Sequence, residues 1–261
     1  MNRIDKLFQQ GKKNLLSVYF TAGFPEINDS LPIIKALDKF GADMIEIGMP
    51  FSDPIADGPV IQDSSSKAIK NGMNLKLLFE QLKDMRKETD LSMLLMGYIN
   101  PILNMGMDSF IENCSICGID GCILPDLPPS EYLEKYKAKF EQAGLKNVLL
   151  ITPQTSEERI RKIDKISEGF IYVVSSYSTT GSGKGFRKEQ ISYFDRIAKM
   201  NLETPLMTGF GISNKEDLEL TGKYTSGGIV GSSFIRSLDG SGTIDEKVKR
   251  FTEVFRDGEE G

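Results

Sequence analysis

The sequence of 261 residues predicts a single-domain (β/α)8 barrel. Eight short apolar runs alternate with longer amphipathic stretches along the chain, which is typical of a parallel α/β sheet. No Pro/Ser-rich linker or change of composition divides residues 1–261, and about 250 residues is the usual length of such a barrel. An open doubly wound sheet would alternate in the same way. It is disfavoured because residues 21–25 lack the glycine fingerprint of its dinucleotide site.

The predicted elements follow the period of the apolar residues. The eight strands are residues 15–20, 44–48, 93–98, 121–124, 148–151, 170–174, 205–208 and 228–231. Helices are expected at 29–40, 75–87, 130–143, 156–166, 189–199, 213–220 and 245–255, and another begins near Met107. Ser156 and Ser213 read as N-caps, and Glu216 completes a capping box with Ser213. The charged amphipathic start of the chain predicts an extra N-terminal helix, and a short helix should follow the eighth strand.

The charge and hydropathy of the chain argue against nucleic acids and membranes as its partners. The net charge is −5, and no dense block of Lys or Arg suggests a nucleic-acid or anionic-membrane surface. No apolar run is long enough to span a bilayer, and the first residues lack a signal-type apolar run. We therefore expect a cytoplasmic enzyme whose partners are small molecules or proteins.

The chain has no histidine, so other side chains must transfer protons near neutral pH. Carboxylates are the leading candidates, because burial can raise the pKa of Asp or Glu into the working range. A histidine-dependent metal site is excluded, and three cysteines cannot form a four-thiolate zinc site. An all-oxygen Mg²⁺ or Ca²⁺ site stays open, but we expect no metal. Cys114 and Cys117 have thioredoxin-like spacing, yet they fall at a helix end, so they and Cys122 are expected to be buried apolar side chains.

Glu46 is the most informative residue, because it is a lone carboxylate inside the second apolar run. A buried ion is costly unless it is paired or used. An ion pair with a neighbouring strand would explain it, but the other predicted strands contain no Lys or Arg. In a barrel, catalytic residues gather at the carboxyl ends of the strands. The sequence therefore predicts a catalytic role for Glu46.

The loop after this strand, residues 49–60, is rich in proline and carboxylates. Asp53 before Pro54 and Asp57 before Gly58 each have a plain interpretation as turn formers. Together with Glu46, however, they bring carboxylates to one end of the barrel. We expect Asp57 to join Glu46 in the site.

Two glycine-containing loops follow the seventh and eighth strands, TGFGIS at 208–213 and GSSF at 231–234. Such loops let backbone N–H groups surround an anion, and this is where barrels commonly hold phosphate. Ordinary turns are the alternative. The polar loop 175–185 is glycine-rich and suits a mobile lid, but it lacks the spacing of a nucleotide P-loop.

These residues together resemble the tryptophan synthase alpha subunit family over nearly the whole chain. The longest match is IEIGMPFSDPIADGPVIQ at residues 45–62. Shorter matches are FTAG at 20–23, LPDLP at 124–128, Thr180-Gly181, and GFGIS at 209–213.

The resemblance implies retro-aldol cleavage of indole-3-glycerol phosphate to indole and glyceraldehyde 3-phosphate. It assigns general acid/base work to Glu46 and makes Asp57 the carboxylate that accepts from the indole N–H. The substrate-binding residues that it implies are Tyr19, Tyr172 and Phe210 beside the indole, Thr180 beside Asp57, and Gly181, Gly211, Gly231 and Ser232 at the phosphate. The tyrosines and Phe210 are equally compatible with core positions.

The resemblance also implies a partner, the tryptophan synthase beta subunit, in an alpha-beta-beta-alpha heterotetramer. Pyridoxal phosphate belongs to that partner, and no cofactor is expected in this chain. The interface residues implied are Pro50, Asp53, Pro54, Asn100 and Pro101. Ile102, Leu103 and Met105 follow in what the sequence predicts to be a loop, where exposed apolar side chains would suit a contact surface.

Two rival functions stay open. Another phosphosugar aldolase or isomerase could use the same barrel, although a Schiff-base enzyme would need an inward lysine, and no predicted strand has one. A catalytically silent barrel could instead activate a partner enzyme, which the intact Glu46 and Asp57 disfavour.

Overall fold

Eight parallel strands close into a barrel in the computed structural model of the chain, which describes residues 1–175 and 186–256. Each strand pairs with its neighbours in sequence, and the first also pairs with the eighth. The strands are β1 Leu15–Thr21, β2 Met44–Gly48, β3 Ser92–Met96, β4 Gly121–Ile123, β5 Lys146–Ile151, β6 Ile171–Val174, β7 Leu206–Gly209 and β8 Gly227–Val230. The predicted (β/α)8, or TIM, barrel is confirmed.

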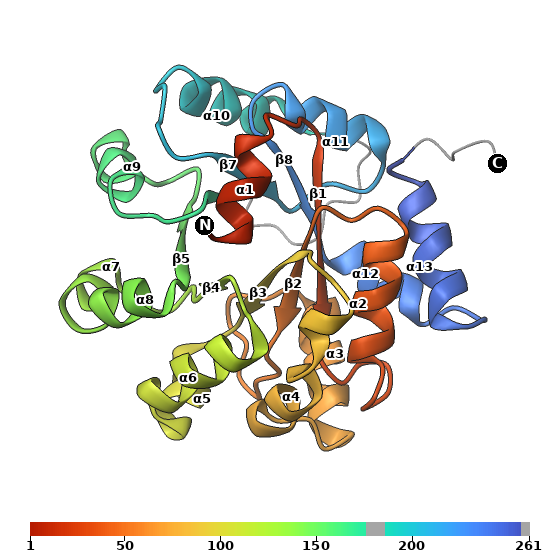
Figure 1. The fold of residues 1–261 in the computed structure, drawn as a ribbon. Coiled ribbons are helices and arrows are strands. Elements are labelled where there is room, and N and C mark those ends of the chain that lie inside the picture. The colour runs from red at the N-terminus through yellow and green to blue at the C-terminus, as the bar shows by residue number, and fades with distance from the viewer. Residues whose placement is uncertain (176–185, 257–261) are drawn as a thin grey trace.

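Helices surround the barrel (Figure 1). Their bounds are α1 Arg3–Gln9, α2 Ser30–Lys39, α3 Pro59–Lys70, α4 Leu75–Leu82, a 3₁₀ turn Met85–Lys87, α5 Ile99–Met105, α6 Met107–Cys117, α7 Pro129–Glu131, a π-helical turn Tyr132–Tyr136, α8 Lys137–Ala143, α9 Glu157–Asp164, α10 Lys188–Ala198, α11 Lys215–Gly222, α12 Ser232–Leu238 and α13 Ile244–Glu253. The predicted N-terminal helix and the short helix after the eighth strand are present as α1 and α12. Among the described residues, no helix has both the length and the apolar character needed to cross a membrane.

Helix α1 closes the N-terminal end of the barrel, where it lies across the ring of strands in Figure 1. Ile4 is fully buried among inward side chains such as Met44, Leu94 and Ile123. The Asn2 amide donates hydrogen bonds to the backbone oxygens of Asp120 and Gly144, at 2.8 and 2.9 Å. The barrel is therefore closed at this end, and its open end is the carboxyl end of the strands.

A second core lies between the outer faces of the strands and the helices. Cys114, Cys117 and Cys122 are buried in it as free thiols, so their predicted character as small buried side chains is confirmed. Burial raises the pKa of the Cys117 thiol to about 11, which keeps it protonated at neutral pH.

The predicted cap of the helix at 213–220 is wrong by one residue. Asn214 is the N-cap of α11, and its side-chain oxygen accepts from the Asp217 backbone N–H at 2.9 Å. Ser213 instead donates its hydroxyl to the Asp217 carboxylate at 2.8 Å, so the capping box expected with Glu216 does not form. The predicted cap at Ser156 is confirmed, because its hydroxyl accepts from Arg159 N–H.

The segment that carries Ile102, Leu103 and Met105 is helix α5, and the prediction of a loop is wrong. Ile102 is buried, Met105 is half-buried and Leu103 is 50% exposed. Pro101 is tolerated because N–H groups in the first turn of a helix have no intrahelical partner. The Asp126 carboxylate, which follows β4, satisfies one of them by accepting from Ile99 N–H at 3.0 Å.

Candidate active site

Glu46 points into the barrel from β2 and is 0% exposed. The Ser17 hydroxyl on β1 donates to its Oε1 atom at 3.0 Å. Its Oε2 atom has no hydrogen-bond partner among the described residues. Burial raises the pKa of Glu46 to about 8, and the bond from Ser17 opposes that rise. No lysine or arginine contributes to the shift, so the alternative of a buried ion pair is not supported within residues 1–175 and 186–256.

Tyr19 and Tyr172 are buried beside Glu46. Tyr19 on β1 stands directly opposite Glu46 in the strand register, and Tyr172 comes from β6. Burial raises the pKa of both phenols, and the charges of Asp57 and Glu46 raise them further. Glu46 and Asp57 therefore both lie close enough to influence the same two phenols. The predicted pair of carboxylates is found at one end of the barrel.

Two glycines make room for these phenols. A Cβ atom on Gly48 would lie 2.2 Å from the Tyr19 hydroxyl oxygen, and one on Gly209 would lie 2.1 Å from that of Tyr172. Only glycine lets the tyrosine hydroxyls occupy these positions. The last residues of β2 and β7 must therefore be glycine for the two phenols to fit in the site.

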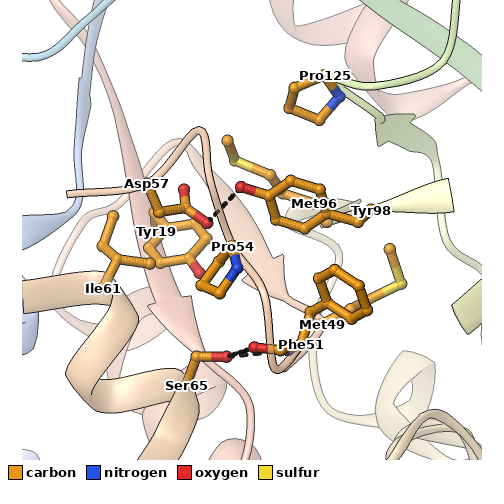
Figure 2. A pocket seen from close by; sticks show the side chains of 11 residues that line it. Tyr19, Met49, Phe51, Pro54, Asp57, Ile61, Ser65, Met96, Tyr98 and Pro125 are labelled. Atoms are coloured by element: carbon orange, nitrogen blue, oxygen red, sulfur yellow. Dashed lines mark hydrogen bonds between the residues drawn. The ribbon is translucent and has the colours of Figure 1, made fainter. Parts of the chain in front are cut away.

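Asp57 lies on the loop after β2 and faces Tyr98, the residue before α5 (Figure 2). The Tyr98 hydroxyl donates to Asp57 Oδ2 at 3.1 Å and accepts from the Ala56 backbone N–H at 2.8 Å. Burial raises the pKa of Asp57 to about 6, and the hydrogen bond from Tyr98 limits the rise. Asp57 is therefore mostly charged at neutral pH, whereas Glu46 mostly carries a proton.

A small hollow beside Asp57 is walled mainly by apolar and aromatic side chains (Figure 2). The rings of Phe51 and Tyr98 are 5.2 Å apart, centroid to centroid. Phe51 is held by Ser65, whose hydroxyl accepts from the Phe51 N–H at 2.9 Å and lies 3.0 Å from its carbonyl oxygen. The other lining residues are Tyr19, Met49, Pro54, Ile61, Met96, Gly97 and Pro125. An apolar wall with one carboxylate suits a flat aromatic ring that carries a single N–H.

The ends of β7 and β8 hold Phe210, expected beside the indole, and the residues expected at a phosphate. Phe210 has a left-handed backbone, with φ of 70°, and the Ser175 hydroxyl donates to its carbonyl oxygen at 2.7 Å. This backbone is costly for a residue with a side chain, and such strain is common at functional sites. The Phe210 ring lies 6.5 Å from that of Tyr172, and Gly211 follows with φ of 81°.

Gly231 is the N-cap of α12, and Ser232 is its first residue. A Cβ on Gly231 would lie 3.4 Å from the Tyr19 ring, so this helix start borders the barrel interior. The structure thus brings Gly211, Gly231 and Ser232 to the same end of the barrel as the carboxylates. Thr180 and Gly181, on the predicted lid 175–185, lie outside the described residues, which include only Ser175 of that segment.

The residues expected at a partner interface lie at the mouth of the barrel, on the loop after β2 and on α5. Asp53 and Asn100 are exposed, whereas Pro50, Pro54 and Pro101 are half-buried. Ile55 is 91% exposed on the same loop, and Leu103 is exposed on α5. The hydrogen bonds from Ala56 to Tyr98 and from Tyr98 to Asp57 join the two segments.

Two other chemistries find little support in the described parts of the chain. Strand β5 begins at Lys146, two residues before the predicted run 148–151, so one strand does contain a lysine that the predicted runs left out. The Lys146 ammonium pairs with Asp5 on α1 at 3.1 Å, at the closed end of the barrel, and so cannot serve as a Schiff-base lysine beside Glu46. No three Asp, Glu or Cys side chains of residues 1–175 and 186–256 gather as metal ligands would.

Sequence patterns missed Ser17 and Tyr98, which bond to the two carboxylates. The signal for Ser17 was a small hydroxyl two residues before Tyr19, on the same face of a mainly apolar strand. The signal for Tyr98 was a phenol at the end of the third strand run.

The comparisons with known proteins agree with this geometry. Residues 5–260 match the family model described as "Tryptophan synthase alpha chain". A tryptophan synthase alpha chain of Flavobacterium psychrophilum is 54% identical, and the match covers 98% of this chain and all of that protein. The tryptophan synthase subunit alpha of Legionella pneumophila superposes with a TM-score of 0.87 at 31% identity, covering 98% of this chain and 97% of that chain.

A chain from the tryptophan synthase complex of Pyrococcus furiosus is similar as well. It has a TM-score of 0.84 at 33% identity, and the match covers 94% of this chain and 98% of that one. Family model, close relatives and solved structures all match along nearly the whole barrel. The chain therefore belongs to the tryptophan synthase alpha chain family.

Proposed function

We propose that this chain is a lyase that cleaves indole-3-glycerol phosphate to indole and glyceraldehyde 3-phosphate, as the alpha subunit of tryptophan synthase in tryptophan biosynthesis. The observation that carries the proposal is Glu46, a fully buried carboxyl that has one oxygen without a partner among the described residues, and whose pKa burial raises to about 8. Family membership supports the choice of substrate.

The two carboxyl groups match the two demands of this reaction. Protonation of indole C3 makes the ring cationic, and the charged Asp57 would accept the indole N–H and stabilise that charge. Removal of the proton from the adjacent side-chain hydroxyl lets its oxygen form the aldehyde, while the electrons of the carbon–carbon bond return to the ring. Glu46 gives the first proton and takes the second, so it ends the cycle as it began.

The remaining residues bind the substrate. Tyr19, Tyr172 and Phe210 would flank the indole, while backbone N–H groups near Gly211, Gly231 and Ser232 would hold the phosphate. Thr180 and Gly181 are also proposed to bind the substrate, and this assignment rests on the sequence alone. The chain itself is proposed to need no metal or cofactor, because proton transfer and charge stabilisation account for every step.

The proposed partner is the tryptophan synthase beta subunit, with pyridoxal phosphate, in an alpha-beta-beta-alpha assembly located in the cytoplasm. Support comes from the exposed Ile55 and Leu103 at the mouth, beside Asp53, Pro54 and the start of α5. The relative from Pyrococcus furiosus was solved as a tryptophan synthase complex.

The direct test is indole release from indole-3-glycerol phosphate by the purified chain, with and without the beta subunit. We expect slow release alone and much faster release in the complex. Glu46→Gln should lower kcat by roughly 10²–10⁴-fold, because it removes the proton donor and acceptor but keeps the shape. Asp57→Asn should lower kcat by roughly 10²–10³-fold, because a neutral amide stabilises a cation poorly.

Binding of a phosphate-bearing substrate analogue serves as the control, and it should stay close to wild type in Glu46→Gln. Turnover by Glu46→Gln at the wild-type rate would rule out the proposed mechanism. A wild-type chain that releases no indole yet still activates the beta subunit would point to the catalytically silent alternative.

A further inference from the structure

Ser17 is a buried hydroxyl on the first strand of the barrel. It lies on β1 with 0% exposure, between Leu16 and Val18, both also fully buried. Its register partner on β2 is Met44, and Glu46 is the next inward residue along that strand. The hydrogen bond that the structure gives its hydroxyl is the one donated to Glu46 Oε1, at 3.0 Å.

This bond makes the two oxygens of Glu46 unequal. Oε1 accepts from Ser17, while Oε2 has no partner in the described residues. A neutral carboxylic acid has one carbonyl oxygen that accepts and one hydroxyl oxygen that donates. An O–H that donates to Oε1 favours that atom as the carbonyl oxygen, so the proton of the neutral acid belongs on Oε2.

We propose that Ser17 is a positioning residue for the lyase reaction: its hydroxyl fixes the rotation of the Glu46 carboxyl and leaves Oε2 as the oxygen that exchanges protons with the substrate. This inference rests on the proposed function of Glu46. It assigns to Ser17 no contact with the substrate.

The same hydrogen bond also lowers the pKa of Glu46, which burial raises. The bond strengthens when Glu46 becomes charged, so it opposes the burial that raises the pKa of this carboxyl. Without Ser17, the carboxyl could rotate, and it would hold its proton more tightly. Both changes slow the return of a proton to substrate atoms, while neither alters the phosphate site.

The test compares Ser17→Ala with Ser92→Ala. Ser92 is also a buried strand serine and also pairs in register with Met44, but from β3, and no hydrogen bond joins it to Glu46. Infrared titration of the substrate-free chain would follow the carboxylic C=O band of Glu46, identified by its loss in Glu46→Gln. In Ser17→Ala we expect this band at higher frequency and its titration midpoint raised by roughly one pH unit, the size of one hydrogen bond to a carboxylate.

Kinetics of indole release give the second measurement. Ser17→Ala should lower kcat by roughly 3–10-fold and move the alkaline limb of its pH profile upward with the infrared midpoint, at unchanged KM. Ser92→Ala should match the wild type in both experiments. Ser17→Cys keeps a weaker donor and should give a smaller shift, which decides the question if Ser17→Ala does not fold.

The outcomes separate this inference from the proposed function. A wild-type titration midpoint in Ser17→Ala, with Glu46→Gln inactive, would overturn the role of Ser17 alone. Normal turnover by Glu46→Gln would remove the proposed mechanism and the role of Ser17 with it. A shift of equal size in Ser92→Ala would show general loosening of the barrel and would also overturn the inference.

Discussion

Tyr98 helps to keep Asp57 charged, because its hydrogen bond lowers the pKa that burial raises. Its hydroxyl donates to Asp57 Oδ2 and is itself held by the Ala56 N–H on the same loop. Because a donated hydrogen bond favours the carboxylate over the acid, this contact keeps Asp57 charged to lower pH than burial alone would allow. The acid limb of catalysis should therefore depend on Tyr98 as well as on Asp57.

We predict that the rate falls as the pH drops through about 6, where Asp57 takes up a proton, and that Tyr98→Phe moves this limb upward by roughly one unit. The measurement is the pH profile of kcat for indole release. The substrate phosphate also titrates near pH 6, but its limb would not respond to Tyr98→Phe.

Tyr132→Phe is the matched control for Tyr98→Phe. Tyr132 is buried and donates its hydroxyl to the Glu168 carboxylate at 2.7 Å, away from the site. This variant loses the same kind of bond, so its acid limb should stay in place. Equal shifts in both variants would mean that Tyr98 acts only through stability.

Glu46 and Asp57 could be predicted from the sequence around them. A carboxylate inside an apolar strand, or in a proline-rich loop after it, is unusual enough to be noticed in the sequence alone. The surrounding sequence was not enough for Ser17 or Tyr98. Serine on a strand and tyrosine at a strand end are ordinary, and their partners are 29 and 41 residues away. The pairing of β1 with β2 brings Ser17 to Glu46, and the path of the loop after β2 brings Asp57 to Tyr98; neither can be read from local sequence.

Helix α5 lies at the mouth of the barrel and follows strand β3. The Asp126 carboxylate caps its start by accepting from Ile99 N–H, so the loop after β4 holds a helix that follows β3. The exposed Leu103 projects from this helix, next to Asn100. The position of the proposed contact surface should therefore depend on Asp126.

Asp126→Ala is expected to weaken binding of the beta subunit and its activation of indole release, while the isolated chain loses only about 1 kcal/mol of stability, as for loss of a helix cap. Titration of the beta subunit against each variant, with indole release as the readout, measures this. Asn74→Ala is the control, since Asn74 caps α4 by accepting from Leu77 N–H at 3.0 Å. Equal partner affinity in both variants would contradict the prediction.

Helices α3 and α5 were not predicted, because the period of their apolar residues does not reveal them. Helix α3 buries Ile61, Ser64, Ser65 and Ala68, a face too polar to appear as an apolar stripe. Helix α5 contains Pro101 and takes its cap from a distant loop. The strands were predicted because a barrel buries both of their faces, which makes each one a nearly continuous apolar run.

For the whole molecule, a buried acid makes stability depend on pH. Glu46 has a pKa of about 8 when folded and about 4.5 when unfolded, so the folded chain binds the additional proton between these values. This contribution to stability is fully present below pH 4.5 and is lost as the pH rises toward 8, at up to about 1.4 kcal/mol per pH unit.

Glu46→Gln should lack this dependence and should gain stability relative to the wild type by a few kcal/mol between pH 5 and pH 8. Urea unfolding at several pH values would measure the difference. Glu80→Gln, which changes an exposed glutamate, should follow the wild-type curve. Parallel curves for Glu46→Gln and wild type would show that Glu46 is ionised in the folded chain.

The closure of the barrel by Ile4 and α1 bears on the order of events in a catalytic cycle. Because the barrel is open only at the carboxyl end of its strands, the products must leave through the same opening by which the substrate entered. With the phosphate proposed at the β7 and β8 loops and the ring beside Asp57, the two products would leave over different parts of one rim. Indole would exit next to α5, which makes any protein seated on that helix its first acceptor.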